Sequence, residues 1–139
     1  MSPAERLSLL AQELDAVAAG LWHRDGDQLL QVCFVSSPAL PANVGTLFAD
    51  ATRTVPLVNL GLGIVRAAVL GEVTLSISSE LPGESGSGYW LRAFGAACSV
   101  AVPIDTGVVS IALVEVPLNL DAVVERLRKD MCQGDRNSP

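Results

Sequence analysis

The sequence predicts an α+β fold in which five antiparallel strands form one sheet with helices on both of its faces. The expected elements follow one another as helix, two strands, helices, strand, helix, two strands and helix, an order that suits this assembly. The last two strands, at 97–104 and 108–116, are apolar at nearly every position. A strand with one face in water alternates apolar and polar residues, so this hairpin is expected at the sheet centre, covered on both faces.

The N-terminal part of the chain predicts a helix followed by a hairpin. The helix is expected at 3–16, with Ser2 as its cap and a proline in the first turn. Its leucines recur three and four residues apart and form one apolar stripe. Residues 18–23 and 28–35 predict two strands, which a tight Asp-Gly turn joins.

The middle of the chain predicts short helices separated by loops. One helix is expected from Asn43 as its cap to about Thr52, and another at 61–70, ending at Gly71. Residues 55–60 are ambiguous, with a short extended piece as one interpretation. Alternating apolar and polar residues at 72–78 predict a strand with one wetter face. A loop rich in Pro, Gly and Ser follows at 80–88, before a short helix at 89–96.

The C-terminal part predicts a last helix, which starts at Asn119 or Asp121 and runs to about Met131. The sequence has no internal repeat and no linker long enough to divide it. Its 139 residues, 50% of them hydrophobic, fit one domain with a thick core. We therefore expect a single domain at 1–132 and a flexible tail at 133–139.

Charge and cysteine content exclude several classes of partner and place the chain in the cytoplasm. Nine basic and fifteen acidic residues give a net charge of −6, without the basic stripe that nucleic-acid binding needs. The charge-free stretch at 29–49 contains prolines and polar residues, so no membrane helix is expected. The N-terminal residues are too polar for a signal peptide, and three cysteines without a Cys-x-x-Cys pair indicate reduced thiols in the cytoplasm.

The sequence contains few residues in the patterns that catalytic or metal-binding sites need. The single histidine, His23, offers little for a zinc site or a catalytic triad, and Asp25-Gly26-Asp27 is better explained as a turn. We therefore predict no catalytic residue, no metal and no cofactor. The glycine-rich segment at 83–88 precedes a helix, but Glu84 would repel a phosphate, so a mobile loop is preferred over an anion site.

The candidate ligand-binding residues are Tyr89, Trp90, Arg92 and Arg66. The first three lie on a helix beside the loop, where an aromatic ring and a guanidinium can meet a small acid or ring. Arg66 is the only charge in an otherwise apolar helix. In the alternative interpretation, Trp90 packs into the core with Phe94 and the arginines point to water. Cys98 has uncharged neighbours and is expected to be structural rather than reactive.

Three segments together resemble the GAF domain family. Residues 61–73 resemble a glycine-led helix running into a Gly-Glu-Pro-Val strand start, with Val73 where a proline is common. Residues 90–104 resemble the family's Arg-x-x-Gly-x-x-Ser-x-x-x-Val-Pro-Leu segment. Residues 107–116 resemble the strand that follows this segment in the family, with Ser110 in place of a usual glycine. The resemblance implies a five- or six-stranded antiparallel sheet. Its terminal helices would lie on one face, with short helices and loops over a pocket on the other. A roadblock-like regulatory fold is the rival architecture.

The resemblance also implies a function. It predicts a non-enzymatic sensory or regulatory domain that binds an unidentified small molecule or a signalling-protein partner and signals through its terminal helices. The bilin, cyclic-nucleotide and sulfoxide-reductase signatures of the family are not matched. In the family the terminal helices commonly build a dimer, so we predict a homodimer through their apolar stripes, which contain Leu7, Leu10, Leu14, Val124, Leu127 and Met131. The alternatives are a ligand-free dimerisation scaffold and a thiol-based reductase, whose activity Cys98→Ser and Cys132→Ser should remove; Cys33, Cys98 and Cys132 do not match the cysteine setting of the family's reductases.

Overall fold

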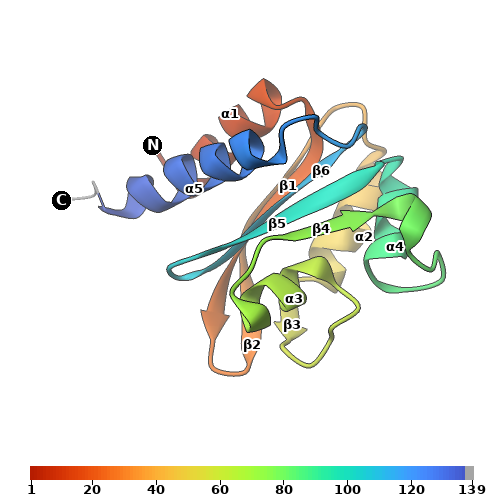
Figure 1. The fold of residues 1–139 in the computed structure, drawn as a ribbon, viewed down its shortest axis with the longest axis horizontal. Coiled ribbons are helices and arrows are strands. Elements are labelled where there is room, and N and C mark those ends of the chain that lie inside the picture. Colours follow the sequence, from red (N-terminus) through yellow and green to blue (C-terminus); the bar gives the residue numbers. More distant parts are fainter. Residues whose placement is uncertain (137–139) are drawn as a thin grey trace.

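One six-stranded antiparallel sheet organises the computed structural model, which describes residues 1–136 and the side chains through Met131 (Figure 1). The strand order is β3-β2-β1-β6-β5-β4. The strands are β1 (Ala16–Asp25), β2 (Gln28–Ser36), β3 (Thr54–Pro56), β4 (Thr74–Ile77), β5 (Cys98–Ile104) and β6 (Gly107–Leu113). The predicted α+β class with an antiparallel sheet is confirmed.

Helices cover both faces of this sheet, as the sequence predicts. They are α1 (Pro3–Glu13), α2 (Ala42–Ala51), α3 (Gly63–Leu70), α4 (Gly86–Phe94) and α5 (Leu120–Arg136), with a short 3₁₀ turn, η1 (Ser78–Glu80). Figure 1 shows α1 and α5 side by side on one face, with α2, α3 and α4 on the other. The helix α5 continues past Met131. The predicted tail at 133–139 stays a prediction, since its side chains and all of 137–139 lie outside the described residues.

The β5–β6 hairpin is buried on both faces, but only β6 is central in the sheet, since β5 lies next to the edge strand β4. Val100, Val102 and Val109 pack into the core under α1 and α5. Ala101 and Val108 point the other way, into a second core under α3. Because both faces are covered, neither strand needs polar residues in alternation, which explains its nearly continuous apolar sequence.

Several local signals in the sequence are confirmed. Ser2 caps α1 through a capping box, in which its Oγ accepts from the Glu5 amide at 3.1 Å. The helix α3 ends at Gly71, whose φ of 68° is the left-handed conformation that glycine adopts easily. At the start of α5, the Oδ1 of Asn119 accepts from the Ala122 amide at 3.1 Å.

Other boundaries differ from the prediction. Pro41, not Asn43, precedes α2, and no side chain caps this helix. The ambiguous stretch at 55–60 contributes β3, a three-residue edge strand that starts at Thr54. The loop at 80–88 is shorter than expected, because η1 and the first turn of α4 occupy its ends. β1 extends to Ala16 and Asp25, because it pairs with β2 on one side and β6 on the other.

The terminal helices pack against the sheet of their own chain. Five of the six stripe residues predicted for a dimer are buried there, and Leu14 packs partly buried beside them. Arg126 on α5 also pairs with Glu13 at the end of α1, which joins the two helices. A dimer built on these helices therefore has to use their outward faces, and the predicted homodimer stays a prediction. None of the described helices is long and apolar enough to cross a membrane.

Candidate functional site: a cavity lined by aromatic rings

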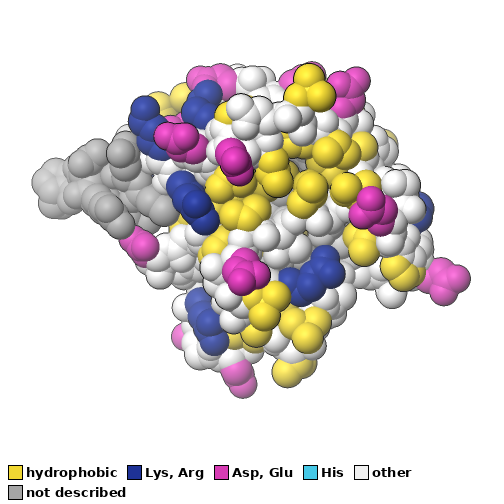
Figure 2. All heavy atoms as spheres, viewed as in Figure 1, with side chains coloured by type: hydrophobic (Ala, Val, Ile, Leu, Met, Phe, Trp, Pro, Cys, Tyr) yellow, Lys and Arg dark blue, Asp and Glu magenta, His cyan; other side chains and the backbone are white. Residues whose placement is uncertain are grey.

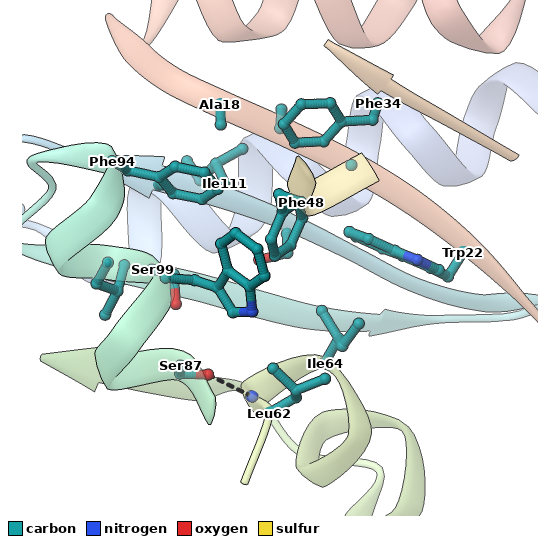
Figure 3. Close-up of a pocket in the computed structure, with 17 residues that line it drawn as sticks. Ala18, Trp22, Phe34, Phe48, Leu62, Ile64, Ser87, Phe94, Ser99 and Ile111 are labelled. Carbon is teal, nitrogen blue, oxygen red and sulfur yellow. Dashed lines mark hydrogen bonds between the residues drawn. The ribbon is translucent and has the colours of Figure 1, made fainter. Parts of the chain in front are cut away.

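A cavity of about 50 Å³ lies between the sheet and helices α2 and α4 (Figure 3). Strands β1, β2, β5 and β6 supply one side of it, and α2, α4 and the start of α3 supply the other. Its lining residues are apolar apart from serines at 87, 99 and 110. The cavity therefore occupies the face of the sheet opposite the terminal helices.

Aromatic side chains dominate the cavity wall. The chain has six aromatic residues, and five of them line this space: Trp22, Phe34, Phe48, Trp90 and Phe94. Phe48 on α2 lies in the middle of this cluster, with its ring centroid 5.1 Å from those of Trp90 and Phe94. Figure 3 shows the rings of Phe34, Phe48 and Phe94 directed toward one another from β2, α2 and α4. The edge-to-face contacts of Phe48 with Trp90 and Phe94 favour a fixed arrangement of these rings.

The indole of Trp22 is held in place from two sides. Its Nε1 donates a hydrogen bond of 2.8 Å to the Thr52 carbonyl at the end of α2. Its ring lies over Gly20, two residues earlier on the same face of β1, where an added Cβ would be 2.3 Å from the ring atom Cη2. The glycine therefore makes room for the indole against the sheet, and the hydrogen bond satisfies the polar atom of a buried side chain.

Two helix starts meet at the cavity wall. The Gly63 amide at the beginning of α3 donates to the Ser87 Oγ on α4 at 2.8 Å, the bond drawn in Figure 3. The Ser87 amide in turn donates to the Gly61 carbonyl at 3.0 Å. Gly86 has a φ of 64°, and a Cβ there would be 2.5 Å from the Gly61 oxygen. The two helices approach closely because glycine stands at this point.

Comparison with solved structures shows which known fold this architecture is similar to. The GAF domain of a two-component sensor histidine kinase from Bacillus halodurans superposes with a TM-score of 0.63 and 11% identity, over 100% of this chain and 99% of that one. The chain has a GAF-like fold. The GAF domain region of a putative membrane protein from Geobacter sulfurreducens gives a TM-score of 0.67 and 12% identity, with coverage of 96% and 89%.

The similarity is one of structure rather than sequence. A type II free methionine-R-sulfoxide reductase from Thermoplasma acidophilum also superposes, with a TM-score of 0.62 and 11% identity over 92% of this chain and 86% of that one. No family model matches the sequence. No curated protein matches it either. The chain is thus a divergent form of the GAF-like fold.

Of the four ligand-binding candidates, only Trp90 lines the cavity of this GAF-like fold. Tyr89 is 47% exposed and packs its ring edge-to-face on Trp90 from outside. Arg66 lies in a different groove, beside β4. The prediction that these residues bind a ligand stays a prediction. Trp22, Phe34 and Phe48 were not among the candidates, and the scarcity of aromatic residues in this chain is the signal that points to them.

Arg92 makes contacts that fix the segment leading into α4 and the first turn of this helix. Its guanidinium donates to three backbone carbonyls, those of Ser78 and Leu81 at 2.9 Å and of Gly88 at 3.2 Å. Gly83 lies against this guanidinium, where an added Cβ would be 2.6 Å from Nη1. All three acceptors belong to the 78–88 segment, so Arg92 orders this part of the chain rather than facing the cavity.

The residues that line the cavity determine which kind of molecule it can hold. No charged side chain lines it, so a charged ligand would lose its hydration there without an ionic partner. The polar side-chain groups in the wall are the three serine hydroxyls and the indole N–H groups of Trp22 and Trp90, and the Trp22 N–H is already bonded to the Thr52 carbonyl. Typical ligand sites have volumes of roughly 300–1,000 Å³. The cavity therefore suits a very small uncharged molecule, or a larger one that displaces a ring.

The two cysteines whose side chains are described, Cys33 and Cys98, lie in surroundings that do not activate a thiol. Burial raises the pKa of the Cys98 thiol. Burial also raises the pKa of Cys33, although the positive charge of Arg6 partly opposes it. A reactive thiolate needs the opposite shift. Across the described residues, no group of three or more His, Cys, Asp or Glu side chains is placed to hold a metal ion. Cys132 lies outside the described side chains.

Proposed function

We propose that the chain is a non-enzymatic regulatory domain that senses a small, uncharged and mainly apolar molecule in the aromatic-lined cavity. The observation that carries this proposal is the gathering of five of six aromatic side chains around one space with no charged wall. An apolar ligand gains from leaving water in such a site, and the serines at 87, 99 and 110 supply hydrogen bonds that orient it. Resemblance to the GAF domain of a sensor histidine kinase supports the sensory role.

Entry of a ligand is proposed to involve Trp90. This side chain is only partly buried, in contrast to Trp22, and it lines the cavity with Tyr89 packed outside it. A rotation of the Trp90 ring would enlarge the 50 Å³ space without opening the sheet. The cost is the loss of its edge-to-face contact with Phe48.

The sheet offers a direct physical connection from the cavity to the terminal helices. On β6, Ser110 and Ala112 line the cavity, whereas Val109 faces the core under α1 and α5. Ile111 contacts both the cavity and that core. A ligand that displaces β6 would therefore change the packing of α1 and α5, which we propose as the output that a homodimer or a signalling-protein partner reads. The proposed location is the cytoplasm.

Native mass spectrometry after gentle purification tests the proposal, combined with thermal unfolding across a panel of small apolar and charged metabolites. We expect retained mass or a higher Tm with uncharged apolar compounds and no effect from nucleotides. Ser110→Val, which removes one hydroxyl from the wall, should change the ranking of the ligands. An empty protein with no thermal shift from any compound would contradict sensing.

A ligand-free interaction scaffold is the second candidate. The specific observation in its favour is the small cavity, whose aromatic rings already contact one another. In that case the aromatic cluster is simply the core of this face, and the native mass spectrum would show an empty dimer. The thiol-based reductase is not favoured, because burial raises the pKa values of Cys33 and Cys98. Loss of reductase activity in Cys98→Ser or Cys132→Ser would revive it.

A further inference from the structure

The free edge of β4 differs from the other edge of the sheet. The other edge is β3, which has only three residues and contains Pro56, a residue that cannot donate to a ladder. The strand β4 pairs with β5 alone and contains no proline and no lysine. In an antiparallel ladder, alternate residues of an edge strand direct their N–H and C=O groups outward. Such an edge is able to accept another strand unless the protein protects it.

The two faces of β4 have different chemistry. Leu75 and Ile77 face the core under α5 but are only partly buried, because this helix packs mainly on β5. Figure 2 shows hydrophobic side chains gathered in a band between α5 and this side of the sheet. Ser76 faces α3, where an added Cβ on Gly63 would be 2.9 Å from its Oγ. A groove of about 360 Å³ follows the strand between α3 and residues 80–81.

Arg66 supplies a positive charge to this groove. Its Nη2 donates to the Ser76 Oγ at 3.1 Å. Its Nε is buried and has no hydrogen-bond partner among the described residues. A guanidinium pairs best with a carboxylate through two parallel hydrogen bonds. Glu80 also lines the groove but makes no ion pair with Arg66.

We propose that the β4 edge, with Arg66 beside it, is a docking site for an extended segment of a partner protein in which apolar and acidic residues alternate. The backbone of that segment would add a seventh strand next to β4. Successive side chains of a strand point to opposite faces. Its apolar side chains would thus extend the band beside α5, while a carboxylate on the other face would meet Arg66.

A second copy of the chain fits this edge less well. Two β4 strands pairing antiparallel around Leu75 or Ser76 would bring the two Arg66 guanidinium groups close together. Like charges in these positions disfavour the symmetric arrangement. Arg66, which makes no ion pair with Glu80 across the groove, instead favours a partner that brings a carboxylate to it.

Two short peptides test the proposal on the full ¹⁵N-labelled chain, one alternating valine with glutamate and one alternating valine with lysine. We expect the glutamate peptide to slow amide hydrogen exchange at 74–77. Its affinity should exceed that of the lysine peptide by about tenfold, the effect of one charge-assisted hydrogen-bonded pair. Arg66→Glu should reverse this preference. Arg66→Gln keeps a donor for Ser76 and should remove the preference, which preserves the test if the glutamate variant does not fold.

Arg24→Glu is the matched control, because it makes the same charge change at an exposed position on β1. This variant should keep the preference for the glutamate peptide. The proposal is wrong if neither peptide slows exchange at 74–77, or if Arg24→Glu weakens binding as much as Arg66→Glu. It is also wrong if exchange at β4 slows with the concentration of the chain alone and a dimer forms, since β4 would then pair with itself.

Discussion

Replacement of Phe48 by alanine is the most direct test of the aromatic cluster. The Phe48 ring contacts the rings of Trp22, Phe34, Trp90 and Phe94, at centroid distances of 5.1–6.3 Å. Loss of a core phenylalanine costs roughly 3–5 kcal/mol, because apolar contact is lost and a cavity remains. Since Phe48 is only partly buried, we expect about 3 kcal/mol, which for a chain of this length lowers Tm by roughly 10 °C.

The same substitution should create a binding site. The space left by the ring adjoins the existing cavity of about 50 Å³, and enlarged apolar cavities of this kind bind benzene. Benzene should therefore raise the Tm of Phe48→Ala and leave that of the unmodified chain nearly unchanged. Thermal unfolding followed by circular dichroism, with and without benzene, measures both effects.

Leu47→Ala is the control, because Leu47 is the neighbour of Phe48 on α2 but is 58% exposed. It should change the free energy of unfolding by no more than about 0.5 kcal/mol. The reasoning would be refuted if Phe48→Ala cost less than about 1 kcal/mol and benzene had no effect. In that case the rings would not form a packed cluster around one space.

Three further predictions concern the framework around the site. Gly20→Ala should destabilise the fold by about 1–3 kcal/mol in urea denaturation, because the new Cβ collides with the Trp22 ring. Ser2→Ala should lower Tm, since it removes the cap of α1. Hydrogen bonds with the backbone and side chain of Ser2 hold the pKa of Glu5 below its usual range. The stabilisation from these bonds is therefore present above that range and is lost as the pH falls through the lowered pKa. The difference in Tm between the unmodified chain and Ser2→Ala should accordingly shrink in acid. Burial raises the pKa of the Cys98 thiol. In a variant with the other two cysteines replaced by serine, Cys98 should therefore react with a disulfide reagent far more slowly than a free thiol. The free energy of unfolding should also fall as the pH rises through the ordinary thiol range, since the thiol ionises more readily in the unfolded chain.

The sequence predicts those parts of the fold that depend on local patterns. The apolar runs of the β5–β6 hairpin indicate burial on both faces, and Ser2 and Gly71 mark helix ends by their own chemistry. In contrast, β3 has three residues, too few for any periodicity, and forms because β2 offers it an edge. Its existence is a property of the tertiary structure.

The candidate site is harder to predict, because its residues come from distant parts of the chain. Phe34, Phe48 and Phe94 meet only after the sheet and both helices are in place. A sequence pattern identifies Arg66 and Arg92 as charges near apolar or aromatic residues, but it does not give the direction of a long side chain. Backbone carbonyls of the preceding segment orient Arg92, and the hydroxyl of a strand residue contacts Arg66.

The position of the tryptophans gives the chain an intrinsic optical probe. Both tryptophans of the sequence line the cavity, one almost fully buried on β1 and the other partly exposed on α4. The only tyrosine lies against the exposed one, with the ring centroids of Tyr89 and Trp90 5.1 Å apart. Emission from this protein therefore originates almost entirely at the site, so its wavelength and quenching report the state of the cavity without an added label.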